Sequence, residues 1–302
     1  MAQSRSLLLL LLLVGCRARP YEEVFVDLDA GVRAEAAPDA SSARVLRVSV
    51  AAIQSPTGTF GGYSKLLKVL SGDLGVEVTL VQRRSYRETN ELLTSGRIDV
   101  AFVCTGGLFD LRRSGVAVDV LAVPVVRGTT TYQSLIIVPA SSSARRLEDL
   151  AGRRFAFTDE LSLSGYAWPT YAVRSLGLEP LRFFASSYFT HSHDRAVEAV
   201  ARGFVDGAAV DSNIFEDMVA ANPALAEQVR VVARSDPFGI PPVVALESLD
   251  AATRAKVRAS LLSLHTRPAG TALLKELSVE RFVEPPPGLY DTAFVILEGA
   301  RK

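Results

Sequence analysis

From Arg44 onward, short apolar runs alternate along the chain with longer segments whose apolar residues recur at helical spacing. This alternation is typical of an α/β fold, because a short run suits a buried strand and a longer segment suits a covering helix. In the first half we predict strands at 45–51, 76–81 and 98–103, with helices at 63–70 and 88–93. In the second half we predict strands at 154–157, 181–184 and 205–210, helices at 166–176 and before Gly203, and C-terminal elements at 251–265, 268–277 and 290–298.

One segment of the second half repeats a segment of the first at an offset of 107 residues. Residues 96–103 (GRIDVAFV) align with residues 203–210 (GFVDGAAV), so that Gly, Asp, Ala and Val recur in register. The same offset aligns two positions at the start of the preceding helix, Ser85 with Ser192 and Tyr86 with His193. The repeat is either a chance similarity or the mark of two similar lobes whose helix N-termini face a shared cleft. We expect Asp99 and Asp206 to be structural, satisfying backbone between helix and strand.

The first sixteen residues predict export. Arg5 precedes an apolar run from Leu7 to Val14, which as a helix covers ~12 Å, far less than the ~30 Å hydrocarbon core of a membrane. The run therefore indicates a signal peptide, and its end at Gly15-Cys16 resembles the bacterial lipobox. An ordinary secretory signal with a chance cysteine is the alternative. We expect a mature chain that begins at lipidated Cys16 and is anchored to a membrane, facing the periplasm or the cell exterior.

Composition narrows the class of protein. Residues 17–43 lack sustained apolar periodicity and predict a flexible tether. The 302 residues include 33 basic and 33 acidic side chains without a basic block, so we expect no nucleic-acid partner. Two cysteines, Cys16 and Cys104, are too few for a disulfide framework or a multi-cysteine zinc site. His191 and His193 point oppositely in an extended segment and have no evident third ligand, so we expect no metal, no cofactor and a monomeric chain.

Residues 46–249 resemble the phosphonate, phosphite and phosphate binding proteins of ABC importers. The resemblance is carried by the segments 96–101 (GRIDVA), 147–157 (LEDLAGRRFAF), 162–166 (SLSGY), 193–194 (HD), 203–210 (GFVDGAAV) and 235–242 (SDPFGIPP). It implies two Rossmann-like α/β lobes with a ligand cleft between them, as in type II periplasmic binding proteins. We expect lobe 1 to comprise 44–127 plus 240–302 and lobe 2 to comprise 128–239. The implied function is capture of a small tetrahedral oxyanion and its delivery to an ABC permease.

The segment Ser162-Leu163-Ser164-Gly165 lies between a predicted strand and a predicted helix. Hydroxyl groups and free amides at a helix N-terminus form a cradle for an anion, although simple capping by Ser164 explains the same residues. In the family that the chain resembles, a Ser-Thr-Ser-Gly turn holds the phosphonate oxygens. Leu163 stands at the position of the middle hydroxyl, so that one side-chain donor is missing.

Three further side chains are candidates through the resemblance. His193 lies at a helix N-terminus, where imidazole can donate to an anion and a cationic ring adds charge, although such a residue is often solvated or capping. A His–acidic pair at this place in the family donates to the phosphonate. Tyr86 and Tyr132 match two tyrosines that line the cleft, although either tyrosine alone is equally typical of packing.

Four more residues complete the predicted site. Family members that bind aminoalkyl phosphonates carry a carboxylate where Asn213 stands here, with Asp211 two residues away. A neutral Asn favours a ligand without an ammonium group. Thr57 and Thr59 open the segment before the first predicted helix and offer donors, although an ordinary Gly turn explains them as well.

Two other classes of function remain as alternatives. An enzyme is disfavoured because the sequence has no nucleophile-elbow, phosphate-loop, metalloprotease or dinucleotide motif. A triad of Ser164, His193 and Asp194 would need hydrogen bonds that adjacent His and Asp side chains do not easily make. The second alternative is a membrane-tethered sensor or scaffold that keeps the binding-protein fold without transport, which the unusual Leu163 favours.

Overall fold

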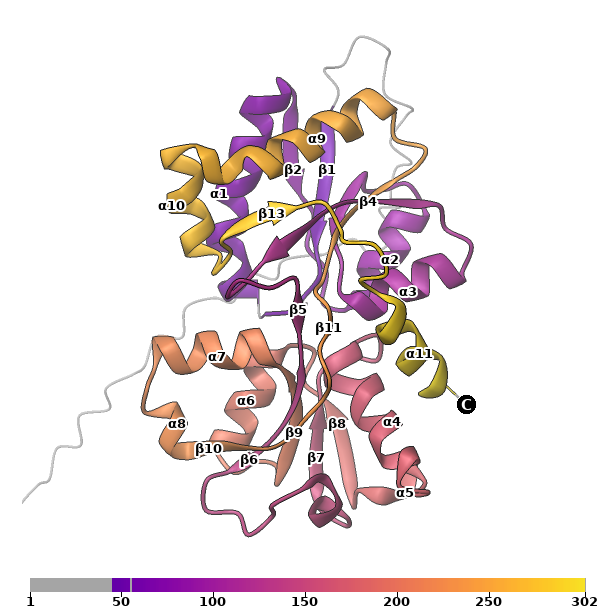
Figure 1. Ribbon diagram of the computed structural model, residues 1–302, viewed down its shortest axis with the longest axis vertical. Coiled ribbons are helices and arrows are strands. Elements are labelled where there is room, and N and C mark those ends of the chain that lie inside the picture. Colours follow the sequence, from indigo (N-terminus) through magenta and orange to yellow (C-terminus); the bar gives the residue numbers. More distant parts are fainter. Residues whose placement is uncertain (1–44, 55, 302) are drawn as a thin grey trace, which may run out of the picture. The chain divides into compact units, whose positions relative to one another are not determined.

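Two β-sheets organise the described residues, 45–54 and 56–301 of a computed structural model (Figure 1). The predicted signal peptide, Cys16 and the segment 17–43 lie outside these residues. The first sheet has the order β13-β4-β12-β3-β1-β2. Its strands are β1 (Val45–Val50), β2 (Glu77–Leu80), β3 (Val100–Phe102), β4 (Val118–Val125), β12 (Val243–Leu246) and β13 (Arg281–Val283).

The second sheet has the order β10-β6-β9-β7-β8. Its strands are β6 (Ser134–Pro139), β7 (Arg154–Phe157), β8 (Ser186–Phe189), β9 (Gly207–Asp211) and β10 (Val229–Arg234). In each sheet three strands pair in parallel, β1 with β2 and β3, and β7 with β8 and β9. Two short antiparallel strands, β5 (Thr131–Tyr132) and β11 (Phe238–Gly239), run side by side where the chain crosses between the two sheets (Figure 1).

Helices cover the sheets. Below, the first half of the molecule means the six-stranded sheet with its helices, and the second half means the five-stranded sheet with its helices. The helices of the first half are α1 (Pro56–Leu74), α2 (Tyr86–Thr94), α3 (Thr105–Arg113), α9 (Ala251–Ser263) and α10 (Pro268–Glu276), with a short 3₁₀ turn at Leu264–Thr266. Those of the second half are α4 (Trp168–Ser175), α5 (Pro180–Phe183), α6 (His193–Ala201), α7 (Ser212–Ala221) and α8 (Leu225–Gln228), with a 3₁₀ turn at Leu147–Leu150 and a π-helical turn at Leu163–Ala167. None of the described helices has both the length and the hydropathy to cross a membrane.

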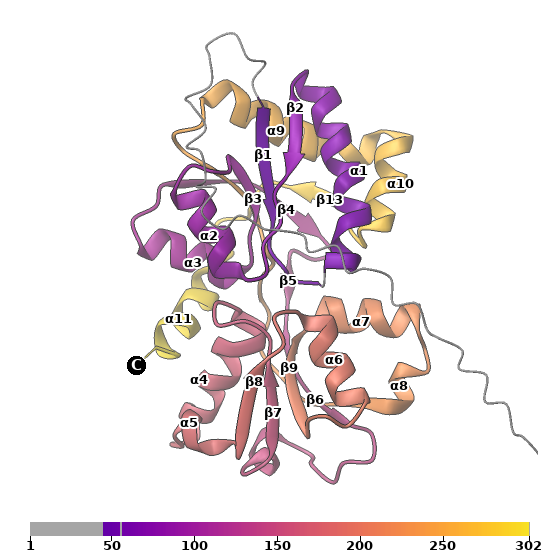
Figure 2. The ribbon, with the colours of Figure 1, turned by 180° about the vertical axis from the view of Figure 1, so that it is seen from behind.

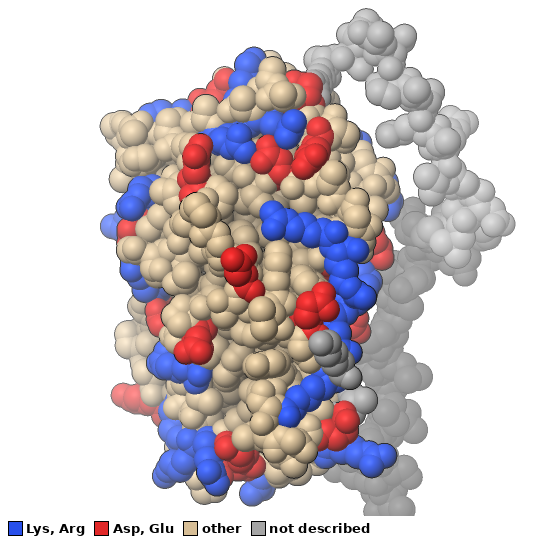
Figure 3. Space-filling model, turned by 45° about the vertical axis from the view of Figure 1, so that its right-hand side comes forward, with Lys and Arg blue, Asp and Glu red and all other residues tan. Residues whose placement is uncertain are grey.

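The inner strands β6 and β9 of the five-stranded sheet are buried on both faces, because nearly all of their side chains are apolar or small. Leu135 and Ile137 of β6 pack with α6, whereas Ile136 and Val138 pack on the opposite side with Val173 of α4. Figure 2 shows α4 and α5 on one side of this sheet and α6, α7 and α8 on the other. On the face shown in Figure 3, basic and acidic side chains are interspersed around a mostly uncharged central area.

The structure corrects two of the predicted elements. The run 181–184 is not a strand, since α5 occupies it and β8 follows at Ser186. Pro180 suits the first turn of a helix, and Phe184 stacks on Phe155 with ring centroids 4.1 Å apart. Helix α1 begins at Pro56, seven residues before its predicted start at 63. A three- or four-residue apolar run cannot distinguish strand from helix, which explains the first error.

The lobe limits stay a prediction, and the strands are distributed between the two sheets as that prediction requires. Helix α11 (Asp291–Gly299) differs from the others, because it contacts α3 of the first half and α4 of the second (Figure 1). The segment 240–302 is therefore not packed against the first half alone.

The repeat of 107 residues corresponds to a repeated structural unit. The Arg47 guanidinium and backbone N–H both donate to the Asp99 carboxylate, with N···O distances of 2.8 to 3.2 Å. Arg154 and Asp206, each 107 residues further on, make the same three contacts at 2.9 to 3.1 Å. The first pair ties β1 to the turn before its parallel neighbour β3, and the second ties β7 to the turn before β9. Both aspartates are structural, as predicted.

Candidate ligand-binding site

The predicted polar residues meet where the two halves face each other. Tyr86 lies at the first position of α2, His193 at the first position of α6, and Tyr132 in the crossing strand β5. Each of these side chains is at most 4% exposed. We name the following group the central cluster: Tyr86, Cys104, Tyr132, Asp159, Ser162, Ser164, Ser192, His193 and Asp211, all of them buried.

Tyr86 joins the two halves through its backbone. Its N–H donates to Asp159 Oδ2 at 3.1 Å, and the other oxygen of Asp159 accepts from the Leu161 N–H at 2.9 Å. Ser85 caps α2 in a capping box with Glu88, so the backbone at this helix N-terminus is well satisfied. The Tyr86 hydroxyl, in contrast, is buried without a hydrogen-bond partner among the described residues. Burial raises its pKa well above the usual value, so it remains a donor.

The polar groups at the N-terminus of α6 find their hydrogen-bond partners differently. Ser192 makes no side-chain cap, and its buried hydroxyl lacks a hydrogen-bond partner within the described part of the chain. The His193 N–H donates to the Ile53 carbonyl of the first half at 3.0 Å. The Asp211 N–H donates to His193 Nδ1 at 2.9 Å, and therefore the neutral ring carries its proton on Nε2.

This geometry corrects the expected charge of His193. Burial lowers the pKa of the imidazole to about 3, so the ring is neutral at physiological pH and offers a donor without a charge. The same hydrogen bond excludes the triad of Ser164, His193 and Asp194, because an orienting carboxylate would need a proton on Nδ1. Nδ1 is instead an acceptor.

The turn that contains Ser162 and Ser164 is a cap as well as a candidate cradle. Ser162, rather than Ser164, is the capping residue, because its Oγ accepts from the Gly165 N–H at 2.9 Å. The Ser164 backbone carbonyl accepts from the Ser134 hydroxyl. Position 165 requires glycine because the Thr158 side chain lies against its backbone, and a Cβ there would lie 1.6 Å from Thr158 Oγ1. Leu163 packs into an apolar cluster and not among the polar groups.

Asp211 is a buried carboxyl at the end of β9. It caps α7 by accepting from the backbone N–H groups of Asn213 and Ile214, at 2.7 and 3.3 Å. Burial raises its pKa to about 7, so it is half-protonated near neutrality. The Asn213 side chain is turned to Arg127, whose Nη1 donates to Asn213 Oδ1 at 3.2 Å.

The remaining predicted residues lie in α1. Thr57 and Thr59 fall in the first turn of that helix rather than before it, and their side chains lie outside what the structure describes. The offset of 107 aligns Thr57-Gly58 with Ser164-Gly165. Within the described residues, no group of three His, Cys, Asp or Glu side chains is placed to hold a metal ion.

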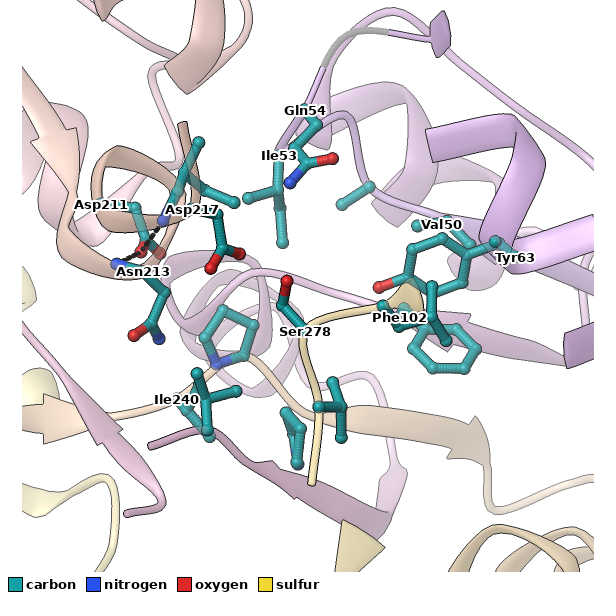
Figure 4. A pocket seen from close by; sticks show the side chains of 18 of the residues that line it. Val50, Ile53, Gln54, Tyr63, Phe102, Asp211, Asn213, Asp217, Ile240 and Ser278 are labelled. Atoms are coloured by element: carbon teal, nitrogen blue, oxygen red, sulfur yellow. Dashed lines mark hydrogen bonds between the residues drawn. The ribbon is translucent and has the colours of Figure 1, made fainter. Parts of the chain in front are cut away.

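A cavity of about 340 Å³ adjoins the central cluster. It is lined by the end of β1, by α1, by α7 and by the turn after α10. Of the predicted site residues whose side chains the structure describes, only Asp211 and Asn213 line it (Figure 4). No local sequence pattern predicts this cavity, because its walls come from many separate segments whose apolar residues are indistinguishable from core.

Sequence reasoning also missed two polar residues beside the predicted site. Asp159 and Thr158 follow directly after β7, and a buried Thr158 hydroxyl lacks a hydrogen-bond partner among the described atoms. The Thr158 carbonyl accepts from the His191 N–H at 2.7 Å, which places it beside Ser192. Position at the carboxyl end of a parallel strand was the signal that could have found them.

A family profile described as ABC transporter, phosphonate, periplasmic substrate-binding protein matches residues 48–290. The phosphate-import protein PhnD of Mycolicibacterium smegmatis is 27% identical over 184 residues, covering 58% of this chain and 57% of that relative. The chain thus aligns with little more than half of that relative's length.

Two solved structures are similar in fold. A binding protein component of an ABC phosphonate transporter from Pseudomonas aeruginosa has a TM-score of 0.80 at 20% identity, covering 86% of this chain and 87% of that one. PhnD1 from Prochlorococcus marinus, in complex with methylphosphonate, has a TM-score of 0.78 at 20% identity, covering 85% and 98%. These likenesses confirm the predicted fold of two α/β lobes.

Proposed function

Because the chain belongs to the family of phosphonate periplasmic substrate-binding proteins of ABC transporters, we propose that its central cluster captures a small tetrahedral oxyanion. The ligand is a phosphonate, phosphite or phosphate, and the loaded protein delivers it to an ABC permease. The relative named for phosphate import and the neighbour that holds methylphosphonate support this ligand class. The predicted family is confirmed by the profile match.

One observation carries the proposal. The hydroxyls of Tyr86, Thr158 and Ser192 are buried within one neighbourhood and have no hydrogen-bond partner in the described part of the chain. A buried polar group left unsatisfied costs about 1–3 kcal/mol. A tetrahedral oxyanion supplies several acceptors at once, and His193 Nε2–H adds a further donor. The N-terminus of α6, which lacks a side-chain cap, contributes favourable field for negative charge.

The titratable groups give this site a pH dependence. Burial raises the pKa values of both Asp159 and Asp211, and the neutral His193 ring does not offset their charge. A protonated Asp211 can donate to an anion, whereas an ionised Asp211 repels it. Anion affinity is therefore highest below pH 7 and falls as the pH rises through the pKa of Asp211, about 7.

Access to the cluster requires the two halves to separate, because its side chains are almost fully buried. Opening breaks the contacts from Tyr86 N–H to Asp159 and from His193 N–H to the Ile53 carbonyl. Ligand bound between them then favours the closed arrangement, which is how a hinged protein couples binding to recognition by a partner.

Export and anchoring complete the proposal. The chain acts as a monomeric binding protein rather than as an enzyme, held at the membrane by a diacylglyceryl group on Cys16. The apolar run Leu7–Val14, followed by Gly15-Cys16, supports this anchor. Mass spectrometry of the membrane fraction should find lipid on Cys16 as the first residue. An unmodified N-terminus upstream of Cys16 in that fraction would contradict the anchor.

A thermal-shift screen of the mature chain tests the ligand class. The panel comprises phosphate, phosphite, methylphosphonate, aminoethylphosphonate, sulfate and taurine. A ligand at about 100 times its Kd stabilises the folded state by about 2.7 kcal/mol, which raises the Tm by several degrees. A response to at least one phosphorus oxyanion is expected, with sulfate and taurine weaker. No response to any member contradicts oxyanion capture and favours a sensor or scaffold.

A further inference from the structure

The cavity beside Asp211 is larger than an inorganic oxyanion needs. Its volume of about 340 Å³ exceeds the ~150 Å³ of an apolar protein cavity that holds benzene. It also falls at the lower end of the range of ~300–1,000 Å³ that is typical of small-molecule sites. A methylphosphonate in the central cluster would leave this space empty.

The walls of the cavity suit an apolar group. Tyr63, Phe102 and Phe282 form a chain of edge-to-face aromatic contacts, with centroid distances of 5.1 and 6.4 Å. Val50 and Ile240 line the same space (Figure 4). Aromatic and aliphatic walls of this kind bind an organic group through burial of its surface.

Charge at the cavity argues against a second anion there. None of the described residues that line it is Lys or Arg. Two of its carboxylates are paired with cations, Asp217 with Arg127 at 2.5 Å and Glu276 with Lys65 at 2.6 Å. The inward-pointing hydroxyls of Tyr63 and Ser278 offer polar contacts to a neutral ligand group (Figure 4).

The cavity and the central cluster share their dividing wall. Asp211 belongs to both, because its backbone N–H bonds His193 while its residue lines the cavity. Ile53 also belongs to both, since its carbonyl accepts from the His193 N–H and its side chain points into the cavity (Figure 4). An oxyanion held beside His193 is therefore separated from the cavity by Asp211 and Ile53, and its substituent would reach the cavity past these two residues.

We propose that this cavity binds the organic substituent of the ligand, so that the preferred ligands are phosphonates or phosphate monoesters with an apolar group of about ring size. The inference rests on the proposed function and specifies its ligand. The acidic head occupies the central cluster and the apolar group occupies the cavity between α1 and α7.

Calorimetry with benzylphosphonate and methylphosphonate tests the proposal on the mature chain. Burial of the ring should make benzylphosphonate bind at least about tenfold more tightly. Equal affinities, or tighter binding of methylphosphonate, overturn the inference and leave the proposed function intact. If neither compound nor any inorganic phosphorus oxyanion binds, the proposed function itself fails.

A matched pair of variants locates the substituent. Ala221 at the end of α7 lines the cavity, and its exposed neighbour Ala220 does not. Ala221→Trp should fill the space and reduce the preference for benzylphosphonate over methylphosphonate by about tenfold. Ala220→Trp, the control, should leave this preference unchanged. Tyr63→Leu, which removes an aromatic wall, should also reduce it. An unchanged preference in both Ala221→Trp and Tyr63→Leu places the substituent elsewhere and overturns the inference.

Discussion

The segment from α2 to α3 and the segment from α6 to α7 are the same structural unit used twice. In both, a helix ends at a glycine with positive φ, Gly96 at 65° and Gly203 at 71°. In both, an aspartate then holds an arginine of the neighbouring strand. The two units diverge where they face each other. The Arg–Asp contacts that hold the strands are repeated, and the side chains that surround the central cluster are not.

The divergence is clearest at the two helix N-termini. Ser85 caps α2, whereas Ser192, at the aligned position, leaves its hydroxyl without a partner in the described chain. Tyr86 is aligned with His193, and Cys104 with Asp211. The first unit thus offers a neutral phenol and thiol, and the second an imidazole and a carboxyl. The second unit therefore carries most of the ionisable chemistry of the site.

The largest expected effect comes from blocking closure. A Cβ at Gly106 would lie 1.9 Å from the carbonyl oxygen of Leu161 in the other half. Because backbone cannot yield as a flexible side chain does, Gly106→Ala should hold the halves apart and weaken methylphosphonate binding about 100-fold. Asn213 is aligned with Gly106, and its side chain accepts a hydrogen bond from Arg127.

Gly72→Ala in α1 is the control for this variant, since a Cβ there meets no atom within 4 Å. Calorimetry on both variants provides the comparison, with circular dichroism to verify folding. Wild-type affinity in Gly106→Ala would show that closure is not needed for binding.

Asp211 and its counterpart Cys104 should differ in their effect on pH dependence. Asp211 has a pKa near 7 in the folded state and 3.8 as the reference value, so folding takes up a proton between these values. The free energy of unfolding therefore falls as the pH rises through this window. His193 has the opposite effect on the free energy of unfolding. Because its pKa is lowered, stability rises with pH from about 3 to 6.5.

Asp211→Asn should remove the loss of stability that Asp211 causes as the pH rises, and Asn can still cap the helix. The variant should therefore be more stable than the wild type at pH 8 by about 3 kcal/mol. The rise due to His193 between pH 3 and 6.5 should remain in this variant. Cys104→Ser should leave the pH dependence unchanged, because burial raises the pKa of the thiol well above its usual value and keeps it protonated. Denaturant titrations from pH 4 to 8 measure both. An Asp211→Asn profile identical to wild type would refute the assignment.

The two buried tyrosines should respond in opposite directions. Tyr86→Phe removes an unsatisfied hydroxyl, so it should raise the stability of the ligand-free protein by up to about 1 kcal/mol and weaken the oxyanion about tenfold. Tyr132→Phe removes a buried phenol that lies beside the polar side chains of Thr105 and Ser164, so it should lower stability by about 1–2 kcal/mol. Chemical unfolding and calorimetry separate the two effects. A stability loss in Tyr86→Phe with unchanged affinity would mean that its hydroxyl serves the fold.

The smallest effect is expected at the repeated ion pairs. Arg47→Ala and Arg154→Ala should each cost about 1 kcal/mol or less, because both pairs are partly exposed. The hydrogen bond from Arg154 lowers the pKa of Asp206, so this contribution is present above about pH 4 and is lost as the pH falls. Unequal losses in denaturant unfolding would show that the two units are not equivalent scaffolds.

The sequence predicted the repeated scaffold well, and it predicted the site only in part. Alternating strands and helices, the helix-ending glycines and the two aspartates are local signals, and the structure confirms them. The charge of His193 depends on burial by both halves, which no local pattern carries. Leu163 packs into the core and Ser162 takes the capping role, because side-chain direction at a π-helical turn depends on what surrounds it. The cavity beside Asp211 depends on segments that meet only in the folded chain.

A crystal structure of the mature chain grown with methylphosphonate tests the central claim most directly. We expect the phosphonate oxygens within hydrogen-bond distance of Tyr86 Oη and His193 Nε2, between the ends of α2 and α6. A phosphonate bound elsewhere, with the hydroxyls of Tyr86 and Ser192 still lacking partners, would contradict the account.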